Sequence, residues 1–508
     1  MKRRTHRTRT TIKATERAPL PARASVANGS ACDGRRRGTV GLVAAGLTAI
    51  GYAAALAVIG ASRNNGTINT ETTRWLFVTA SVLAGIIFLI GLHSARDRPV
   101  RSTDAIVILG VGVAARLILI PAAPFFVSDC YRYLWDGATT ASGANPWEFA
   151  PGDVLAKVEG GPNAQDVPTE LVELARKSGR NIQRINHPSL STIYPATAQA
   201  VFALAYFVRP WSLGALRFVL LLCDVSTALM LILLLRWLKR PVKDVAWYWW
   251  NPLVLREVSH SAHMDVIVLP FVLLGLFLIV HQRGGLAGLA MALAVGAKIW
   301  PLVLVPLFFR SSAQRLKESV SFLAAFVGIS GLLWWPVVKG TMAGSSGFLA
   351  YATSWINNDA IFSAIRWLTH HALTIASVNP DLGPFVSRLI VACLIASVIV
   401  IQTKRLGHSA IDLVRRSLLV TAAVYFLSPA QFPWYYVWLL PLLALHPRSS
   451  LLMYTVLLPL YYFTHAHPWI RWIEHLPVLG WFAIEAFYAK VDLTVLPPAV
   501  RRDVQVKF

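Results

Sequence analysis

The segment SDCYRYLWDGATTASGANPWEF at residues 128–149 follows directly on an apolar stretch and carries the first candidate catalytic group. A carboxylate at the lip of a helix bundle is partly desolvated, and this raises its basicity. We therefore interpret Asp129 as a candidate general base. Asp129, Arg132 and Asp136 are also spaced to form i, i+3 and i, i+4 ion pairs on a helix, and Asp136 is the better candidate for such a structural role.

Arg116 and Lys298 interrupt apolar sequence and predict an anion in their surroundings. Arg116 lies well within an apolar run, where a lone guanidinium costs about 2.5 to 3.5 kcal/mol on insertion scales. Lys298 stands in GAKIWP, before a proline that breaks the run. Neither residue has a carboxylate neighbour evident in the sequence, which favours a bound phosphate. Snorkelling of either side chain to the membrane interface is the alternative.

A polar cluster interrupts the sequence WYWWNPLVLREVSHSAHMD at residues 247–265. Its members are Arg256, Glu257, His260, His263 and Asp265. His260 and His263 are one helical turn apart and could bind a metal with Asp265, although this spacing matches no recognised metal pattern. A hydrogen-bonded polar cluster at a membrane cavity is the other interpretation.

The segment SPAQFPWYYVWLLPLLALHP at residues 428–447 places aromatic side chains between prolines. These are Trp434, Tyr435, Tyr436 and Trp438. Aromatic belts at the membrane interface account for such residues without any substrate. Aromatic rings also stack on sugar faces and line grooves for isoprenoid chains. Four further tryptophans, in or near another expected outer loop, could serve either purpose: Trp334, Trp335, Trp355 and Trp367.

Composition indicates that membrane helices position these residues. The 508-residue chain is 55% hydrophobic and only 14% charged, which excludes a row of soluble domains. Lys and Arg outnumber Asp and Glu by 48 to 25, but they gather in the N-terminal arm and in short gaps between apolar runs, so no nucleic-acid partner is expected. The four scattered cysteines suggest neither a disulfide framework nor a structural zinc site.

The apolar runs predict an all-α polytopic membrane protein with about 11 to 14 transmembrane or re-entrant helices. We expect a basic, disordered cytoplasmic arm over residues 1–37, followed by a single multi-span domain over residues 38–508. Runs 243–258 and 265–281 are expected to be separate spans, whereas the runs 284–309 and 417–446 look like helix pairs broken at polar or proline-containing turns.

Counting spans from a cytoplasmic arm with the positive-inside rule places two long loops outside, at residues 125–189 and 340–384. The chain must then cross the membrane an odd number of times between residues 190 and 236. We therefore expect the weakly apolar stretch 190–208 to be a re-entrant or interfacial helix that does not cross. His263, Lys298 and Trp434 then share the outer face with Asp129.

Five motifs occur in the order known from one enzyme family. They are DCYRYLWDG with GANPW at 129–147, HPSLSTIYP at 187–195, NPLVL with HMD at 251–265, AKIWPL at 297–302, and SPxxxPWY at 428–435. Residues 104–446 thereby resemble the GT-C superfamily of membrane glycosyltransferases, and within it the bacterial polyprenyl-phosphate-mannose-dependent mannosyltransferases. The first motif is fairly specific, whereas each of the others alone is weak.

This resemblance implies an inverting transfer of a sugar, expected to be mannose, from a polyprenyl-phosphate donor to a glycan or glycolipid acceptor. The enzyme would work on the outer face of the bacterial plasma membrane, in cell envelope biosynthesis, with Asp129 as the base. Arg116, Arg217 and Lys298 are the candidates for binding the donor phosphate, and fixed cations of this kind could replace a metal. The expected sugar and acceptor pocket comprises Arg132, Tyr133, Asp136, His187, Tyr194, His263, Asp265, Trp434 and Tyr435.

Two other classes of function stay open. Broken helices with buried charges also mark transport pathways, so a transporter or flippase of a lipid-linked saccharide is the alternative. A long outer loop that carries acidic and aromatic residues argues against it, because transport needs no base. A lipid-binding assembly subunit without activity is the third possibility.

Overall fold

The computed structural model describes residues 24–161, 167–341 and 347–495. Within these ranges the chain is helical, with one isolated β-bridge between Asn357 and Ala430 as its only extended pairing. The all-α prediction is therefore confirmed for the described residues. Helix α1 (Ala24–Asn64) begins inside the predicted arm, so the prediction of disorder up to residue 37 is wrong for residues 24–37. Residues 1–23 lie outside the described ranges.

Five helical segments in the described part of the chain are long and apolar enough to cross a membrane. They lie in α1, α2 (Thr70–Ser94), α8 (Leu213–Trp237), α14 (Leu316–Thr341), and η6 (Pro380–Leu382) with α17 (Gly383–Lys404). These helices are compatible with a multi-pass membrane protein. A sixth span results if one bent helix pair is counted, so the full-length spans are fewer than the 11 to 14 transmembrane or re-entrant helices expected.

The bent pair corrects the expectation of separate spans at 243–258 and 265–281. Its first arm is Pro252–His260 (α10 and η3), its second arm is Met264–Val280 (η4 and α11), and the arms meet at 101°. Ala262, between them, has a φ of 60°, a left-handed conformation that ends the helix. The residues before it, η2 (Val242–Val245) and α9 (Ala246–Trp249), form short turns instead of a span.

The runs at 284–309 and 417–446 are broken as predicted. The first forms α12 (Gly284–Ala297), η5 (Trp300–Leu304) and α13 (Val305–Ser312). The second forms α18 (Ala410–Leu427), η7 (Pro433–Trp438) and α19 (Leu440–Leu445). Each break lies at a proline, which lacks the N–H of a helical hydrogen bond and disfavours helix in the residue before it.

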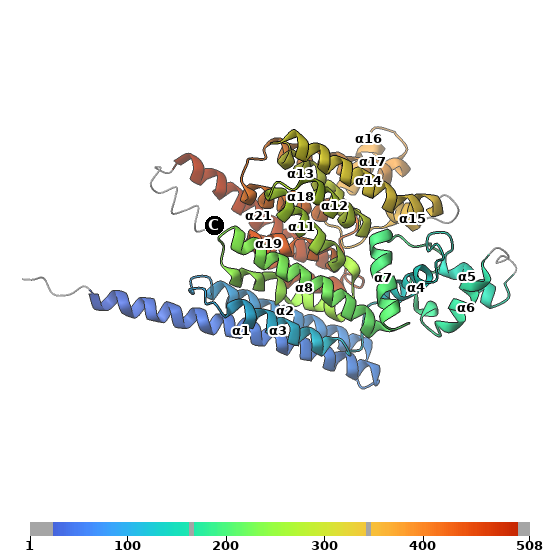
Figure 1. Cartoon of the computed structure of the whole chain (residues 1–508), viewed down its shortest axis with the longest axis horizontal. Coiled ribbons are helices and arrows are strands. Elements are labelled where there is room, and N and C mark those ends of the chain that lie inside the picture. The colour runs from blue at the N-terminus through green and yellow to red at the C-terminus, as the bar shows by residue number, and fades with distance from the viewer. Residues whose placement is uncertain (1–23, 162–166, 342–346, 496–508) are drawn as a thin grey trace, which may run out of the picture.

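One end of the bundle, which we call the loop end, carries the segments that follow α3 (Asp104–Leu119). Figure 1 shows α4, α5 and α6 together at this end, on the right, beside α7. Their bounds are α4 (Asp129–Ala141), α5 (Pro151–Val158), α6 (Thr169–Lys177), η1 (Ile182–Arg184) and α7 (Ala196–Val208). A small apolar core under α4 joins Trp135 and Leu171. About half of the described residues in the expected outer loop 125–189 are thus helical.

The C-terminal third of the described chain adds shorter helices and a last long one. They are α15 (Gly347–Ser354), α16 (Ile361–Ile375), α20 (Ser449–Leu457), η8 (Leu458–Phe463) and α21 (Ile470–Val495). Because α15 and α16 fall within residues 340–384, this predicted loop is mostly helical.

The short basic gaps of the chain meet at the opposite end, which we call the basic end. Lys243 donates hydrogen bonds to the carbonyls of Ala95 (2.6 Å) and Arg96 (2.7 Å), so the gaps after α2 and α8 lie side by side. Gln314 and His408 likewise join the gaps before α14 and after α17. Basic gaps that are far apart in the sequence therefore lie together in the folded bundle.

Candidate active site

The loop end encloses a cavity of about 180 Å³, to which residues far apart in the sequence contribute. Its lining residues are Asp129, Arg132, Tyr133, Asn186, His187, Leu190, Ser191, Thr192, Ile193, Tyr194, Asp265, Lys298, Gly347, Tyr351, Trp355, Phe432, Trp434 and Tyr435. Each of the five sequence motifs supplies at least one residue to this lining. The cavity is therefore the candidate active site.

Asp129 is the first residue of α4, where the partial positive charge of the helix N-terminus favours a carboxylate. Its Oδ1 accepts a hydrogen bond of 2.6 Å from the side-chain amide of Asn186, and its side chain is 19% exposed. The amide fixes one oxygen and leaves the other free to face the cavity and His263. A fixed, partly exposed carboxylate of this kind can accept a proton from a bound hydroxyl.

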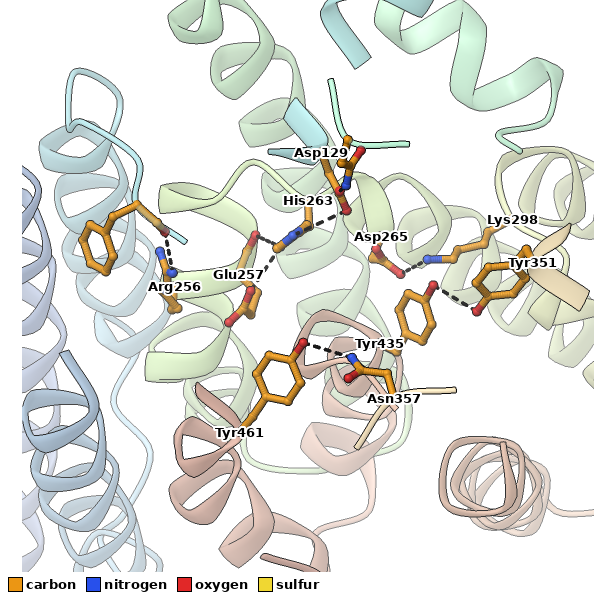
Figure 2. A network of polar contacts seen from close by, with 12 residues as sticks. Asp129, Arg256, Glu257, His263, Asp265, Lys298, Tyr351, Asn357, Tyr435 and Tyr461 are labelled. Atoms are coloured by element: carbon orange, nitrogen blue, oxygen red, sulfur yellow. Dashed lines mark hydrogen bonds and ion pairs between the residues drawn. The ribbon is translucent and has the colours of Figure 1, made fainter. Parts of the chain in front are cut away.

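His263 lies between two carboxylates, as Figure 2 shows. Its Nε2 is 4.0 Å from Oδ2 of Asp129, and its Nδ1 is 3.1 Å from Oε2 of Glu257 and 3.1 Å from the Glu257 carbonyl. Both groups near Nδ1 are acceptors, so Nδ1 carries the hydrogen in the neutral ring. Nε2 then presents its lone pair to Asp129. The ring stacks on Trp434 at 4.0 Å, which fixes its plane.

Lys298 follows the end of α12, and its side chain points toward Asp265 (Figure 2). Its Nζ is 2.6 Å from Oδ1 of Asp265 and 3.9 Å from the centre of the Tyr435 ring. Trp438 donates a second hydrogen bond of 2.6 Å to the same carboxylate oxygen. The expectation that Lys298 lacks a carboxylate partner is therefore wrong, but its ammonium still borders the cavity and has further donors to offer.

Aromatic rings form one wall of the cavity. The hydroxyls of Tyr351 and Tyr435 lie 3.1 Å apart, and the Tyr435 ring stacks on Trp438 at 4.7 Å. Phe432 stacks on Trp434 at 4.5 Å, on the His263 side. The segment at 428–447 thus serves as a cavity wall, and its aromatic residues are not confined to a membrane belt.

Arg132 and Asp136 shape the cavity from behind. The guanidinium of Arg132 donates to the carbonyls of Asn186, His187 and Leu190, which hold that loop against α4. Among the described contacts, Asp129, Arg132 and Asp136 form no ion-pair ladder. Asp136 lies outside the lining and accepts hydrogen bonds from Thr192 (2.5 Å) and from the Gln199 amide (3.3 Å). Burial raises the pKa of Asp136 to about 6.

Arg116 has the carboxylate partner that the sequence does not reveal. Its Nε is 2.7 Å from Oδ2 of Asp224, which lies in α8, and its guanidinium covers the ring of Trp249 at 3.4 Å. The Tyr248 hydroxyl donates to the other oxygen of Asp224 at 2.5 Å. The inference of a bound phosphate rested on the lack of such a partner, and that premise is wrong.

Arg217 is also engaged by the protein, but by backbone groups. Its guanidinium donates to the carbonyls of Ile120 (2.9 Å) and Ala122 (2.6 Å), and also to the carbonyl of His260 at the bend. Neither Arg116 nor Arg217 lines the cavity, so both contribute to the scaffold in this arrangement. Lys298 is the one candidate phosphate ligand of the three that borders it.

The His260, His263 and Asp265 cluster does not converge on a metal position. His260 contacts Arg256 through Nδ1, whereas His263 faces Glu257, and Asp265 pairs with Lys298. Within the described residues, no group of three or more His, Cys, Asp or Glu side chains could hold a metal ion. The hydrogen-bonded cluster is the interpretation that the geometry favours.

Nine of the thirteen predicted site residues line this one cavity. They are Asp129, Arg132, Tyr133, His187, Tyr194, Asp265, Lys298, Trp434 and Tyr435. His263 and Asp136 contact lining residues, whereas Arg116 and Arg217 do not. Glu257 and Asn186 orient the candidate base and its histidine, yet neither was predicted to belong to the site. Asn186 precedes the HPSLSTIYP motif and Glu257 lies in the 247–265 cluster, so proximity to those motifs was the available signal.

Comparison with family models, with curated proteins and with solved structures finds no match for this chain. The resemblance to the GT-C glycosyltransferases thus depends on the quoted motifs alone.

Proposed function

We propose that this chain is a membrane glycosyltransferase that transfers a sugar, with mannose the expected one, from a polyprenyl-phosphate donor to a hydroxyl of a glycan or glycolipid. The observation that carries the proposal is the juxtaposition in one cavity of the Asp129 carboxylate, the Lys298 ammonium and a wall of stacked aromatic rings. The residues of this wall and the two charged groups come from separate segments of the chain, which meet at this cavity.

In the proposed reaction, Asp129 takes the proton from the acceptor hydroxyl while the acceptor oxygen attacks the anomeric carbon of the donor sugar. The bond between that carbon and the phosphate oxygen breaks, and polyprenyl phosphate leaves with the electron pair. The configuration at the anomeric carbon is inverted. Asn186 orients the base, and the lone pair of His263 Nε2 faces the oxygen that receives the proton.

Lys298 is the group that we assign to the departing phosphate. A buried cation stabilises the negative charge that develops on the leaving oxygen. Its ion pair with Asp265 keeps the ammonium in place between turnovers and uses one of three N–H donors, which leaves the others for the phosphate. The aromatic wall beside Lys298 offers the sugar ring a flat surface.

The positive-inside rule supports an active site on the outer face of the bacterial plasma membrane. Basic gaps from distant parts of the chain meet at the basic end, and the cavity lies at the loop end. An acceptor that belongs to the cell envelope would approach from the loop end, whereas a lipid-linked donor would approach from the bilayer.

A second candidate, a flippase for a lipid-linked saccharide, is favoured by the 101° bend and by the break at Lys298, which both lie beside the cavity. Transport across a membrane requires neither a fixed base nor a histidine held between two carboxylates. We therefore prefer the transferase.

The test is a transfer assay with purified protein, a panel of polyprenyl-phosphate sugars and mass analysis of the glycan product. Asp129→Asn should fold normally but lose transfer by at least about a hundredfold, because the amide cannot accept the proton. Glu173→Gln, an exposed change on α6, is the matched control and should retain full activity. Near-native turnover of Asp129→Asn would show that Asp129 is not the base. Movement of lipid-linked saccharide across vesicles without any transfer would favour the flippase.

A further inference from the structure

A second hollow, of about 740 Å³, lies between three helices and shares no lining residue with the cavity. It lies between α16, the beginning of α17 and the beginning of α21. Its lining comprises residues 363–370 of α16, residues 380–384 at the start of α17, and Arg471 and Trp472 of α21. The proposed reaction uses none of these residues.

Guanidinium groups from two of the three helices line this hollow, and one from the third helix lies close by. Arg366 and Arg471 line it, and Arg388 lies one turn into α17, close enough to Arg366 for their charges to repel. Among the described residues, Nε and Nη2 of Arg388 and Nε of Arg471 are buried and have no hydrogen-bond partner. Buried donors without acceptors are unfavourable, so the cluster suits an anion that would supply them.

Two carboxylates lie near the arginines, and neither compensates them well. Oδ1 of Asp359 is 3.8 Å from Arg471, while its Oδ2 accepts a hydrogen bond from Ser363. Burial also raises the pKa of Asp359, which weakens its charge at the acidic end of the pH range. Asp381 is exposed on the rim of the hollow. A phosphate oxygen could therefore still bind the buried N–H groups.

The surface around the hollow is apolar and exposed. Trp367 is 60% exposed, Ile375 is 86% exposed and Phe385 is 69% exposed, and all three belong to α16 or α17. In a protein with membrane helices, such side chains contact acyl chains, while tryptophan prefers the level of the headgroups. A ligand with a charged head and apolar chains matches both parts of this surface.

We propose that the hollow between α16, α17 and α21 binds the phosphate headgroup of an anionic membrane lipid, with Arg366 and Arg471 as its direct ligands and Arg388 behind them. The strap that runs from Trp355 to Asp359 links this site to the cavity, since Trp355 lines the cavity and Asp359 contacts Arg471. The site does not depend on the proposed transferase activity.

The experiment uses full-length protein in bilayer nanodiscs with a photoactivatable phosphatidylglycerol, followed by mapping of labelled peptides by mass spectrometry. Peptides from α16 and from the start of α17 and α21 should be labelled preferentially. Arg366→Gln with Arg471→Gln should reduce this labelling roughly tenfold, the scale of a lost hydrogen bond to a charged group. Lys404→Gln with Arg405→Gln, at the other end of α17, also removes two positive charges and should leave the labelling unchanged. Asp129→Asn should also label normally, because this site is separate from the base.

The same readout gives the results that would overturn the proposal. Equal labelling by photoactivatable phosphatidylcholine, or unchanged labelling in the double arginine variant, would show that the hollow only contacts acyl chains and does not bind an anionic headgroup. Protection by millimolar inorganic phosphate, with no dependence on acyl chains, would indicate a site for a free anion. Size-exclusion profiles that match the native protein show that a loss of labelling is not a loss of fold.

Discussion

His263 is the residue that most directly constrains the chemistry of the cavity. In the neutral ring its Nδ1 hydrogen points to the Glu257 backbone carbonyl, and Nε2 then faces Asp129 as an acceptor. When Asp129 takes a proton, the imidazole can share it, and Glu257 stabilises the resulting positive charge. Glu257 contacts neither oxygen of Asp129, so it is a positioning residue that acts through the histidine.

Glu257→Gln removes this stabilising charge and keeps an acceptor for Nδ1. We expect kcat to fall about tenfold, which corresponds to roughly 1.4 kcal/mol, while KM changes little because Glu257 does not line the cavity. Steady-state kinetics of sugar transfer measure kcat and KM separately. Glu474→Gln is the control, since Glu474 is also buried but is bonded to Asn358, away from His263. Equal kinetics in both variants would remove Glu257 from the mechanism.

At this scale the sequence located the candidate base, but it did not reveal the partners of the cations. Asp129 was found because the motif around it is local and stands at the end of an apolar run. Asp224 is 108 residues from Arg116, and Asp265 is 33 residues from Lys298. Only the packing of separate helices brings these charges together, and apolar periodicity does not specify which helices are neighbours.

The pair of α3 and α8 depends on a buried ion pair. Arg116 and Asp224 are both about 1% exposed, and their contact joins the two helices in the apolar interior. Removing one partner leaves the other charged and buried, which costs more than removing both. The pair is thus a constraint on how these helices meet.

Arg116→Met should destabilise the protein by about 3 to 5 kcal/mol, because Asp224 loses its counter-charge. Arg116→Met combined with Asp224→Leu should recover much of that loss. Denaturant unfolding in detergent, analysed as a double-mutant cycle, measures the coupling. If the single variant were as stable as the native protein, the ion pair would contribute nothing to the helix contact.

Helix α4 is tied to α7 and to the 186–194 loop by Asp136, which makes this contact dependent on pH. The folded pKa of about 6 exceeds the ordinary value of 3.8, so the folded state holds the proton more tightly than the unfolded state. The stabilisation is complete below pH 3.8 and is lost as pH rises to about 6. The total change is about 3 kcal/mol, from 1.36 kcal/mol per pKa unit.

Asp136→Asn imitates the protonated carboxyl and should remove this pH dependence. The melting temperature of the native protein should fall between pH 4.5 and 7. That of the variant should fall less, so the variant should be the more stable of the two at pH 7. Thermal unfolding in detergent across that range measures the difference, with Glu173→Gln as the control. A parallel decline in all three proteins would show that other groups control the pH dependence.

The breaks in the helices illustrate what the sequence could and could not predict at the element scale. Pro301, Pro429 and Pro433 predicted breaks, because proline acts through its own backbone. The bend between Pro252–His260 and Met264–Val280 has no proline at its corner, and the left-handed Ala262 gives no local signal. Arg217 binds the His260 carbonyl at that bend, and this contact joins residues 43 positions apart that the sequence does not pair.

On the scale of the whole molecule, the bundle has one basic end and one end that carries the cavity. Arg240, Arg415 and Arg448 all lie close enough to His446 to act on its charge, so gaps from three parts of the chain converge there. The positive-inside rule predicts orientation from the basic residues near the ends of the spans. In the folded bundle these residues lie away from the loop end.

The proposed orientation predicts the accessibility of two exposed positions in intact cells. With reactive native cysteines replaced, Glu173→Cys on α6 should react with a membrane-impermeant thiol reagent, because the loop end faces outward. Asp97→Cys at the basic end should react only after permeabilisation. Mass-tag labelling visible on a gel measures both. Labelling of Asp97→Cys in intact cells would reverse the orientation.

The bend capped by Arg217 also has a consequence for biogenesis. A half-helix that stops inside the bilayer leaves carbonyl groups without partners, a state that is costly in lipid. Chain synthesis delivers α3 and α8 before the segment from Pro252 to Val280 emerges. The guanidinium that binds the His260 carbonyl is therefore already synthesised when the bend emerges. The order of the helices along the chain supplies the cap before the broken helix that needs it.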